Sequence, residues 1–296
     1  MNMFNLQTIS NQDLEIIELS NQEKTAIARF YPELGGSVQS LILDGEIIID
    51  NVAPLAYKDT YASSILFPFV NRITDGAFDF DGITYQLECN EADANNALHG
   101  HVYNKTFQFV RSQLDLDRGV IVFKYVDNGK TRGFPFRYSI ELVYTVGKEV
   151  FSLKVIIRNL DDRPFPFTIG WHPYFKSSDL FNSQIQFNGS DELQTDLRSK
   201  KGQDTITIPI NDKELDHTFS LFKKKIEFET PKYQLLIRGN HHTKFFQLFT
   251  PKKPNVLAIE PMTGVANSFN NGLGLQVLDP GKMYETEWGL EVVKAS

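Results

Sequence analysis

Residues 37–49 read SVQSLILDGEIII, and this stretch decides the fold that we expect. Both halves are rich in apolar and β-branched residues, which is typical of strands. The Asp44-Gly45 pair between them favours a two-residue hairpin turn. The same arrangement returns at 78–87, which reads FDFDGITYQL, with Asp81-Gly82 between the two runs. The sequence therefore predicts antiparallel hairpins in this part of the chain.

The same two-residue alternation continues through the rest of the chain, and turn residues separate the runs. We expect further strands at 14–19, 25–30, 106–112, 119–126, 136–146, 149–159, 164–170, 184–187, 206–210, 225–229, 233–238, 244–249, 255–260, 274–278 and 284–293. Short helical turns are expected near 62–66, 91–95 and 212–216. No long segment keeps apolar residues at a helical period, and no linker divides the chain. The sequence predicts an all-β protein, a large antiparallel β-sandwich, in a single domain over 1–296.

Charge and cysteine content exclude several classes of protein. The net charge is −7 and no block of Lys and Arg is present, so we expect no nucleic-acid partner. The single cysteine, Cys89, cannot form a disulfide within the chain, which favours a reducing compartment. The first residues lack the basic and apolar regions of a signal peptide. The sequence contains no run of about 18 apolar residues, so we expect no membrane span. We therefore expect a cytoplasmic protein.

Two apolar runs each end in one titratable group followed by proline. Residues 256–259 read VLAI and precede Glu260-Pro261, and residues 167–171 read FTIGW and precede His172-Pro173. Proline disfavours a helical conformation in the residue before it, so both groups are expected at strand ends. A carboxyl and an imidazole held on rigid strands are the groups that proton transfer needs.

Other polar side chains stand in surroundings that suggest a sugar site. Trp171, Tyr174 and Phe175 flank His172 and could form an aromatic wall on which a sugar ring packs, although a lone histidine is often simply a buried ring. Gly100, between His99 and His101, would let another group approach closely. Arg72 follows an aromatic and apolar run and could hold vicinal hydroxyls, or could form a surface ion pair.

The sequence contains no recognisable metal or cofactor motif. His99 and His101 could chelate a metal ion, but zinc sites usually offer three or four converging ligands. No Gly-x-Ser-x-Gly elbow and no glycine-rich phosphate loop before a helix is present. We expect neither a metal nor a cofactor.

Six motifs in order make the chain resemble the aldose 1-epimerase (galactose mutarotase) family, in a bacterial branch with Trp-His-Pro-Tyr-Phe and Glu-Pro-Met-Thr-Gly motifs. The matching segments span about residues 65–270. They are Asn71-Arg72-Ile73 with Gly76 and Phe78, Asn96-Ala97-Leu98-His99-Gly100, Gly170-Trp171-His172-Pro173-Tyr174-Phe175, Asp216-His217-Thr218-Phe219, Phe246-Gln247-Leu248-Phe249-Thr250, and Glu260-Pro261-Met262-Thr263-Gly264 with Asn267.

The resemblance implies a galactose mutarotase-like supersandwich with a sugar cleft across one sheet. It implies that Glu260 is the general base, that His172 is the general acid and that His99 assists at the ring oxygen. The substrate-binding residues that we expect with it are Asn71, Arg72, Trp171, Asp216 and Gln247.

The function expected from these residues is interconversion of the α and β anomers of a free aldohexose. Two alternatives stay open: a mutarotase for hexose phosphates, for which Arg72, Arg132, Arg137 and Lys176 would supply cations, and a carbohydrate-binding protein without turnover. The expected partner is a small sugar, and the expected assembly is a monomer or a homodimer.

Overall fold

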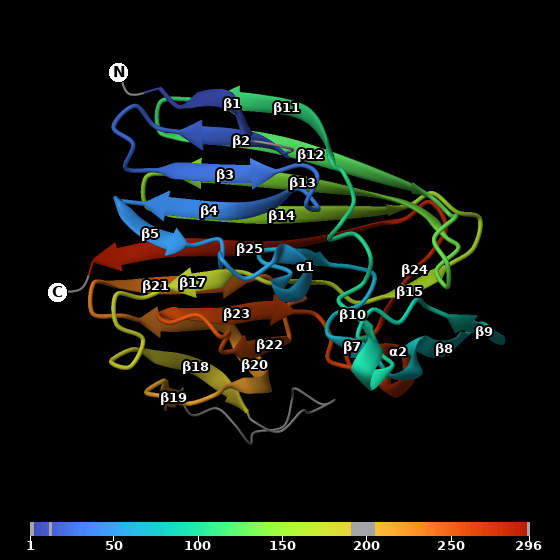
Figure 1. Ribbon diagram of the computed structural model, residues 1–296. Coiled ribbons are helices and arrows are strands. Elements are labelled where there is room, and N and C mark those ends of the chain that lie inside the picture. Colours follow the sequence, from blue (N-terminus) through green and yellow to red (C-terminus); the bar gives the residue numbers. More distant parts are fainter. Residues whose placement is uncertain (1–2, 12–13, 191–204, 295–296) are drawn as a thin grey trace.

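Figure 1 shows the computed structural model, which describes residues 3–11, 14–190 and 205–294. Within these residues 19 strands belong to one sheet, and three two-stranded sheets accompany it. The strands are β1 (Asn5–Asn11), β2 (Leu14–Ser20), β3 (Ile27–Tyr31), β4 (Ser37–Leu43), β5 (Glu46–Ile49), β6 (Ile65–Leu66), β7 (Arg72–Ile73), β8 (Ala77–Phe80), β9 (Ile83–Gln86), β10 (Ala97–Leu98), β11 (Gln108–Leu114), β12 (Arg118–Asn128), β13 (Arg137–Gly147), β14 (Val150–Asn159), β15 (Phe165–Phe167), β16 (Gly170–Trp171), β17 (Tyr174–Lys176), β18 (Gln184–Ser190), β19 (Thr205–Pro209), β20 (Asp216–Glu229), β21 (Tyr233–Gly239), β22 (Phe245–Phe249), β23 (Val256–Met262), β24 (Gln276–Leu278) and β25 (Met283–Lys294).

Both predicted hairpins are present. Leu43 of β4 lies opposite Glu46 of β5, and Asp44-Gly45 forms the turn with φ angles of 47° and 84°. Two positive φ angles in succession give the turn a twist that matches the two strands. The β8–β9 hairpin turns at Asp81-Gly82 in the same way. The Asp-Gly pairs therefore predicted the turns correctly.

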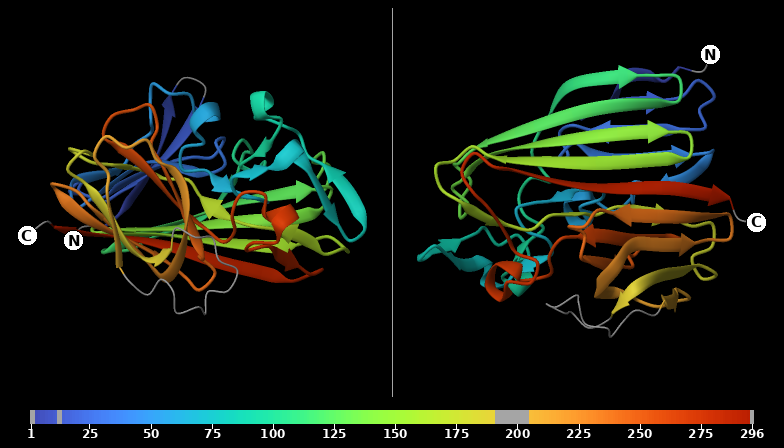
Figure 2. Two further views of the ribbon diagram at one scale, coloured as in Figure 1. Left: turned by 90° about the horizontal axis from the view of Figure 1, so that it is seen from below. Right: turned by 180° about the vertical axis from the view of Figure 1, so that it is seen from behind.

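The large sheet folds back on itself to form two layers. Strands β11, β12, β13, β14, β25 and β21 lie side by side in one layer, and β1, β2, β3, β4 and β5 form the other. Figure 1 shows the first group behind the second, and the right view of Figure 2, which is seen from behind, shows it in front. All of these pairings are antiparallel, so the predicted all-β fold with a large antiparallel sheet is confirmed.

Aromatic side chains fill the space between the layers. The rings of Phe30 on β3 and Tyr144 on β13 have centroids 4.7 Å apart, and the Tyr144 hydroxyl donates a hydrogen bond to the Gly36 carbonyl at 2.9 Å. A buried hydroxyl needs such a partner because leaving it unpaired would cost free energy. The core therefore joins strands that are distant in the sequence.

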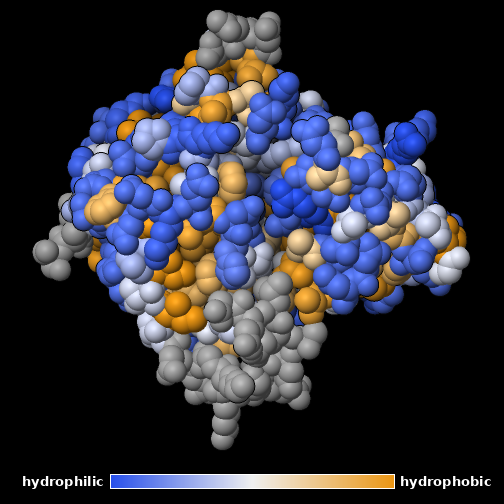
Figure 3. Space-filling model, turned by 60° about the horizontal axis from the view of Figure 1, so that its bottom comes forward, coloured by the Kyte–Doolittle hydropathy of each residue, from blue (hydrophilic) through white to orange (hydrophobic). Residues whose placement is uncertain are grey.

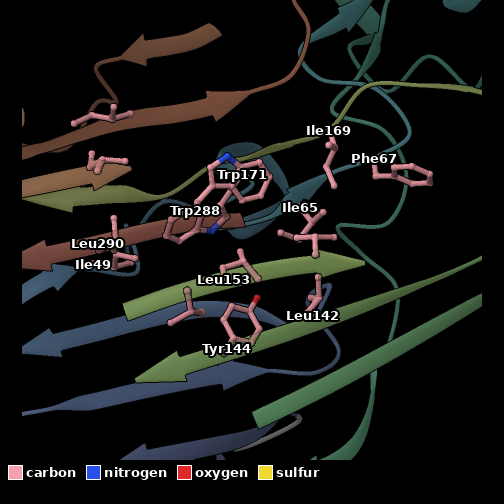
Figure 4. Packing of buried hydrophobic residues seen from close by; sticks show 14 of the residues in the cluster. Ile49, Ile65, Phe67, Leu142, Tyr144, Leu153, Ile169, Trp171, Trp288 and Leu290 are labelled. Atoms are coloured by element: carbon pink, nitrogen blue, oxygen red, sulfur yellow. The ribbon is translucent and has the colours of Figure 1, made fainter. Parts of the chain in front are cut away.

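Trp171 belongs to this core, and its predicted place in the sugar-facing wall is wrong. Its side chain is fully buried, and its ring stacks on that of Phe151 with centroids 5.8 Å apart. On its other neighbour, Trp288, it stacks with centroids 6.4 Å apart (Figure 4). Phe175 is also buried in the core. Successive side chains of an extended segment point to opposite sides, so Trp171 faces away from the side on which His172 lies.

The helices of the described residues are short. They are α1 (Tyr57–Thr60), α2 (Ser268–Asn271) and the 3₁₀ turns η1 (Thr74–Gly76) and η2 (Ala92–Ala94). The turn predicted near 91–95 is confirmed by η2. The helical turns predicted near 62–66 and 212–216 are wrong, because each segment is non-helical and leads into a strand. No described helix has the length and apolar character to span a membrane.

Candidate active site

The register of β23 with its neighbours brings the carboxyl and the imidazole together. On one side of β23, Gly170 of β16 lies opposite Met262 and Tyr174 of β17 lies opposite Ala258. The same antiparallel register places His172, between β16 and β17, directly opposite Glu260. The His172 Nε2 and Glu260 Oε1 atoms are 3.4 Å apart, and both side chains are buried.

The strand that carries Glu260 does not stop at proline, contrary to the prediction. β23 continues through Pro261 to Met262. The amides of Ile259 and Thr263 both donate toward the side of β16 and β17, so the nitrogen of Pro261 faces that side too. There the neighbouring strand is interrupted at His172-Pro173. A missing N–H is tolerated where the ladder is already broken.

Strands β22 and β20 extend the same row of side chains. Gln247 of β22 lies opposite Glu260, and Thr218 of β20 lies opposite Gln247. The Thr218 hydroxyl donates to the side-chain oxygen Oε1 of Gln247, and Gln247 Nε2 donates to Asp216 Oδ1 at 2.6 Å. The structure thus brings Asp216 and Gln247 together beside Glu260. The orienting role of Thr218 was missed, because only the strand register reveals it.

A loop from another part of the chain supplies His99. The ring of His99 meets the ring of His172 edge-on with centroids 5.1 Å apart. His99 and Asn71 both have positive φ angles, 60° and 53°, and the His99 amide donates to the Asn71 carbonyl at 2.8 Å. Left-handed backbone at non-glycine residues is strained and persists where surrounding contacts hold it.

Gly100 is needed for this loop to lie where it does. A Cβ at this position would lie 2.1 Å from the carbonyl oxygen of Phe67, and the φ angle of Gly100 is 70°. Only glycine accepts both conditions. The predicted close approach of another group at position 100 is therefore confirmed, and the group is the backbone of Phe67.

Arg72 is held by a carboxylate that the sequence did not reveal. Arg72 Nη2 donates to Glu91 Oε1 at 2.7 Å, and Arg72 Nε lies 2.9 Å from both Glu91 oxygens. Arg72 Nη1 donates to Asn71 Oδ1 at 3.2 Å. Glu91 lies in a polar loop segment with no motif around it, so no signal in the sequence points to it.

These side chains line one pocket of about 220 Å³. Of the residues predicted for the site, all but Trp171 line it. Of the three residues expected in the aromatic wall, Tyr174 lines the pocket, and its ring stacks on that of His172 with centroids 5.0 Å apart. The lining residues that the sequence did not suggest are Asp59, Thr60, Tyr61, Glu91, Leu98 and Phe249. On the face shown in Figure 3, hydrophilic side chains gather around a hollow near the middle.

Burial drives Glu260 and the two histidines of this pocket toward their neutral forms. Burial, with a smaller contribution from Asp216, raises the pKa of Glu260 well above its usual value, and Arg72 opposes this. Burial lowers the pKa of His172 to about 3 and that of His99 well below its usual value. Burial therefore favours a protonated Glu260 beside a neutral His172, two forms that together hold one proton. Because Nε2 and Oε1 are 3.4 Å apart, the protonation states of the two groups depend on each other.

Two ring nitrogens in the pocket lack partners. Nδ1 of His99 and Nδ1 of His172 are buried and make no hydrogen bond with any described residue. Buried polar atoms without partners are rare in folded proteins and call for a ligand or a water. In the described part of the chain, no group of three or more His, Cys, Asp and Glu residues is arranged to hold a metal ion.

The chain as a whole matches one protein family. The family model described as Aldose 1-epimerase matches residues 15–291. The chain belongs to the aldose 1-epimerase family. An uncharacterized protein of Escherichia coli K12, YihR, is 24% identical over 273 residues, which cover 84% of this chain and 85% of that relative.

Solved structures of this family share the fold. A galactose mutarotase-like protein from Clostridium acetobutylicum superposes with a TM-score of 0.81 at 18% identity, with 99% of both chains covered. The galactose 1-epimerase of Lactobacillus acidophilus superposes with a TM-score of 0.76 at 16% identity, again over 99% of both chains. The predicted galactose mutarotase-like fold is thereby confirmed.

Proposed function

We propose that this protein is an aldose 1-epimerase that interconverts the α and β anomers of a free aldohexose. The observation that carries the proposal is the position of His172 directly opposite Glu260, with Nε2 and Oε1 3.4 Å apart in one wall of the pocket. Opening a pyranose ring needs a base at the C1 hydroxyl and an acid at the ring oxygen at the same time. A carboxyl and an imidazole on adjacent positions of a rigid sheet meet that need.

The proposed reaction conserves the single proton of the pair. The sugar binds to the form with Glu260 ionised and His172 protonated. Glu260 takes the proton of the C1 hydroxyl, His172 gives its proton to the ring oxygen, and the bond between C1 and the ring oxygen breaks as the aldehyde forms. Rotation about the C1–C2 bond then presents the other face of the aldehyde. Reclosure returns both protons by the reverse path.

Burial favours the protonation states that Glu260 and His172 have in mid-reaction. With the ring open, Glu260 is protonated and His172 is neutral, which are the forms favoured by the directions of their pKa shifts. The protein thus supports the open-chain sugar, and a bound polar ligand supplies the stabilisation that the ionised pair needs. Groups whose protonation states are balanced in this way suit reversible proton transfer.

The remaining residues of the pocket suit the hydroxyls of a sugar. We assign His99 to the ring oxygen beside His172, because the two rings are in contact. Asp216 and the Gln247 amide that it holds offer acceptors and donors on the β20–β22 side, and Arg72 with Asn71 offers donors on the loop side. Holding the open chain between these walls keeps its ends close enough to reclose.

The charges of the pocket favour a neutral sugar over a hexose phosphate. Among the described residues that line it, Arg72 is the one Lys or Arg, and Glu91 already pairs with it. The other cations considered for a phosphate lie elsewhere: Arg132 lines a separate pocket, Arg137 pairs with Asp161 and Lys176 pairs with Asp50.

The test is polarimetry of freshly dissolved α-D-glucose and α-D-galactose with and without the protein. The proposal predicts that rotation reaches its equilibrium value faster with the protein than in buffer alone. Sugar binding measured by calorimetry without any such acceleration would replace the proposal with a carbohydrate-binding protein that has no turnover.

A further inference from the structure

We propose that Glu91 is a specificity-determining residue. By pairing with Arg72 it balances the positive charge of that side chain, and the pocket therefore rejects anionic sugars. The inference rests on the proposed function, since it concerns which aldoses that site accepts. Glu91 does not have to touch the sugar for this role. Through its pairing with Arg72, it determines the charge that an entering sugar meets.

The geometry of the pair takes most of the donors of Arg72 away from a ligand. Nε and Nη2 of the guanidinium point to the Glu91 carboxylate, with contacts of 2.7–2.9 Å. Nη1 is turned to the Asn71 side chain. A two-point pair of this kind has a fixed geometry and is stronger than a single contact. Arg72 therefore keeps one N–H on each Nη nitrogen for a ligand hydroxyl, while its charge is already balanced by Glu91.

Glu91 is itself held in place from the other side. Asn96 Nδ2 donates to Glu91 Oε2 at 2.8 Å, and the backbones of Glu91 and Asn96 exchange two hydrogen bonds of 3.1 and 3.2 Å. Arg72 is fixed in turn by its pairing with Leu98 on β10. Because both partners are anchored by backbone, the ion pair is built into the loops and is not a chance meeting of two flexible side chains. The side chain of Glu91 is only 23% exposed.

The rest of the pocket adds no positive charge that would compensate. Asp59 and Asp216 also line it, and neither forms an ion pair with any described residue. An anion that enters meets these carboxylates and an Arg72 that is already neutralised. Like charges within a few ångströms of one another in a partly buried site cost free energy.

The experiment compares D-glucuronate, its neutral amide D-glucuronamide and D-glucose as substrates for anomer exchange. For the unaltered protein we expect kcat/KM for the amide to exceed that for the carboxylate by about tenfold, because the two differ in charge and little in size. In Glu91→Gln the carboxylate should gain about tenfold relative to the amide, since Arg72 then offers an unpaired charge. Glu91→Asp, which keeps the charge, should retain the discrimination.

Glu88→Gln is the matched control. It removes the same charge three residues away, but Glu88 lines a different pocket. An equal shift in Glu88→Gln and Glu91→Gln, or an equal loss of activity on all three sugars in Glu91→Gln, overturns the inference. Equal values of kcat/KM for the carboxylate and the amide in the unaltered protein also overturn the inference. This comparison needs no variant, so it holds even if Glu91→Gln fails to fold. Failure on all three sugars in the unaltered protein would instead refute the proposed function.

Discussion

Among single residues, Glu260 is the one on which the proposed chemistry depends most. Glu260→Gln keeps the size of the side chain but removes its ability to take a proton. We expect kcat to fall by about 10²–10⁴-fold, the usual contribution of a positioned acid or base. Polarimetry on α-D-galactose measures this, and Glu15→Gln, on the distant strand β2, serves as a control for the removal of one charge. Full activity of the Glu260 variant would remove it from the role of base.

The same substitution should stabilise the folded protein at neutral and alkaline pH. Burial raises the pKa of Glu260 in the folded state, so between its unfolded value of about 4.5 and its folded value the folded state binds more protons than the unfolded state. The free energy of unfolding of the unaltered protein therefore falls as pH rises through that window. Glutamine is free of this cost, so the stability difference between the variant and the unaltered protein should grow from pH 5 to pH 8 in urea titrations.

His172 gives a dependence of the opposite sign. Its pKa is about 3 in the folded state, below its unfolded value of about 6.5, so the unfolded state binds more protons between these values. This contribution to stability is present above pH 6.5 and is lost as pH falls toward 3, by at most about 1.4 kcal/mol per pH unit. In His172→Asn the loss of stability between pH 6.5 and pH 4 should be smaller. An unchanged dependence would show that His172 does not titrate as described.

Among the structural elements, the loop that presents His99 depends on a close backbone approach. Gly100→Ala would place a Cβ 2.1 Å from the Phe67 carbonyl oxygen at a φ angle of 70°. We expect a loss of about 2–4 kcal/mol in the free energy of unfolding, together with a lower kcat because His99 is displaced.

Gly45→Ala is the matched control for this prediction. Gly45 has a φ angle of 84°, but a Cβ at this position would meet no atom within 4 Å. The variant should lose only about 1 kcal/mol, the cost of the left-handed backbone, and keep its activity. Equal losses in the two variants would contradict the importance of the contact with Phe67.

The sequence located the long strands well but misplaced the end of β23. Apolar alternation located β12, β13 and β14 to within two residues of their observed bounds. Pro261 suggested that β23 ended at Glu260, yet the strand continues, because proline is harmless where the neighbouring strand is already interrupted. Such an interruption is a property of two segments distant in sequence, so local pattern alone does not reveal it.

The same reason separates the site residues that were found from those that were missed. Glu260, His172, His99 and Arg72 lie in recognisable local motifs. Thr218 enters the site only through its register with Gln247, and Glu91 only through a loop contact with Arg72. The local sequence around Thr218 and Glu91 predicts neither contact.

Across the complete fold, the error over Trp171 shows how the two layers depend on each other. The motif around His172 suggested that this ring lies beside the sugar, but it lies in the core with Trp288 of β25 and Phe151 of β14. The alternation of side chains along the segment sends His172 to the pocket and Trp171 to the opposite side. The sheet thus uses one face for chemistry and the other for the core.

Substitution of Trp171 should therefore affect stability and leave sugar binding intact. Trp171→Ala should lower the free energy of unfolding by about 3–5 kcal/mol, as large core truncations do. Trp171→Phe should be milder and should keep the KM of the unaltered protein. A raised KM in Trp171→Phe without any loss of stability would return the ring to the sugar site.

The family match and the continuous pairing of strands support one domain, which stays a prediction. The cytoplasmic location and the assembly as a monomer or homodimer also stay predictions.

The residues that carry the proposed chemistry come from segments near 71, 99, 172, 216, 247 and 260. The pocket therefore forms only when these distant strands have paired in the large sheet and the loops have packed against it. Its chemistry is a property of the complete fold.

The acid and base pair is tested most sharply by magnetisation exchange between the H1 resonances of the two anomers of D-galactose at equilibrium. For the unaltered protein we predict an exchange rate well above that in buffer. For both Glu260→Gln and His172→Asn we predict a rate close to that in buffer, with both variants folded. Exchange that stays fast when either side chain is replaced would contradict an acid and base pair formed by Glu260 and His172.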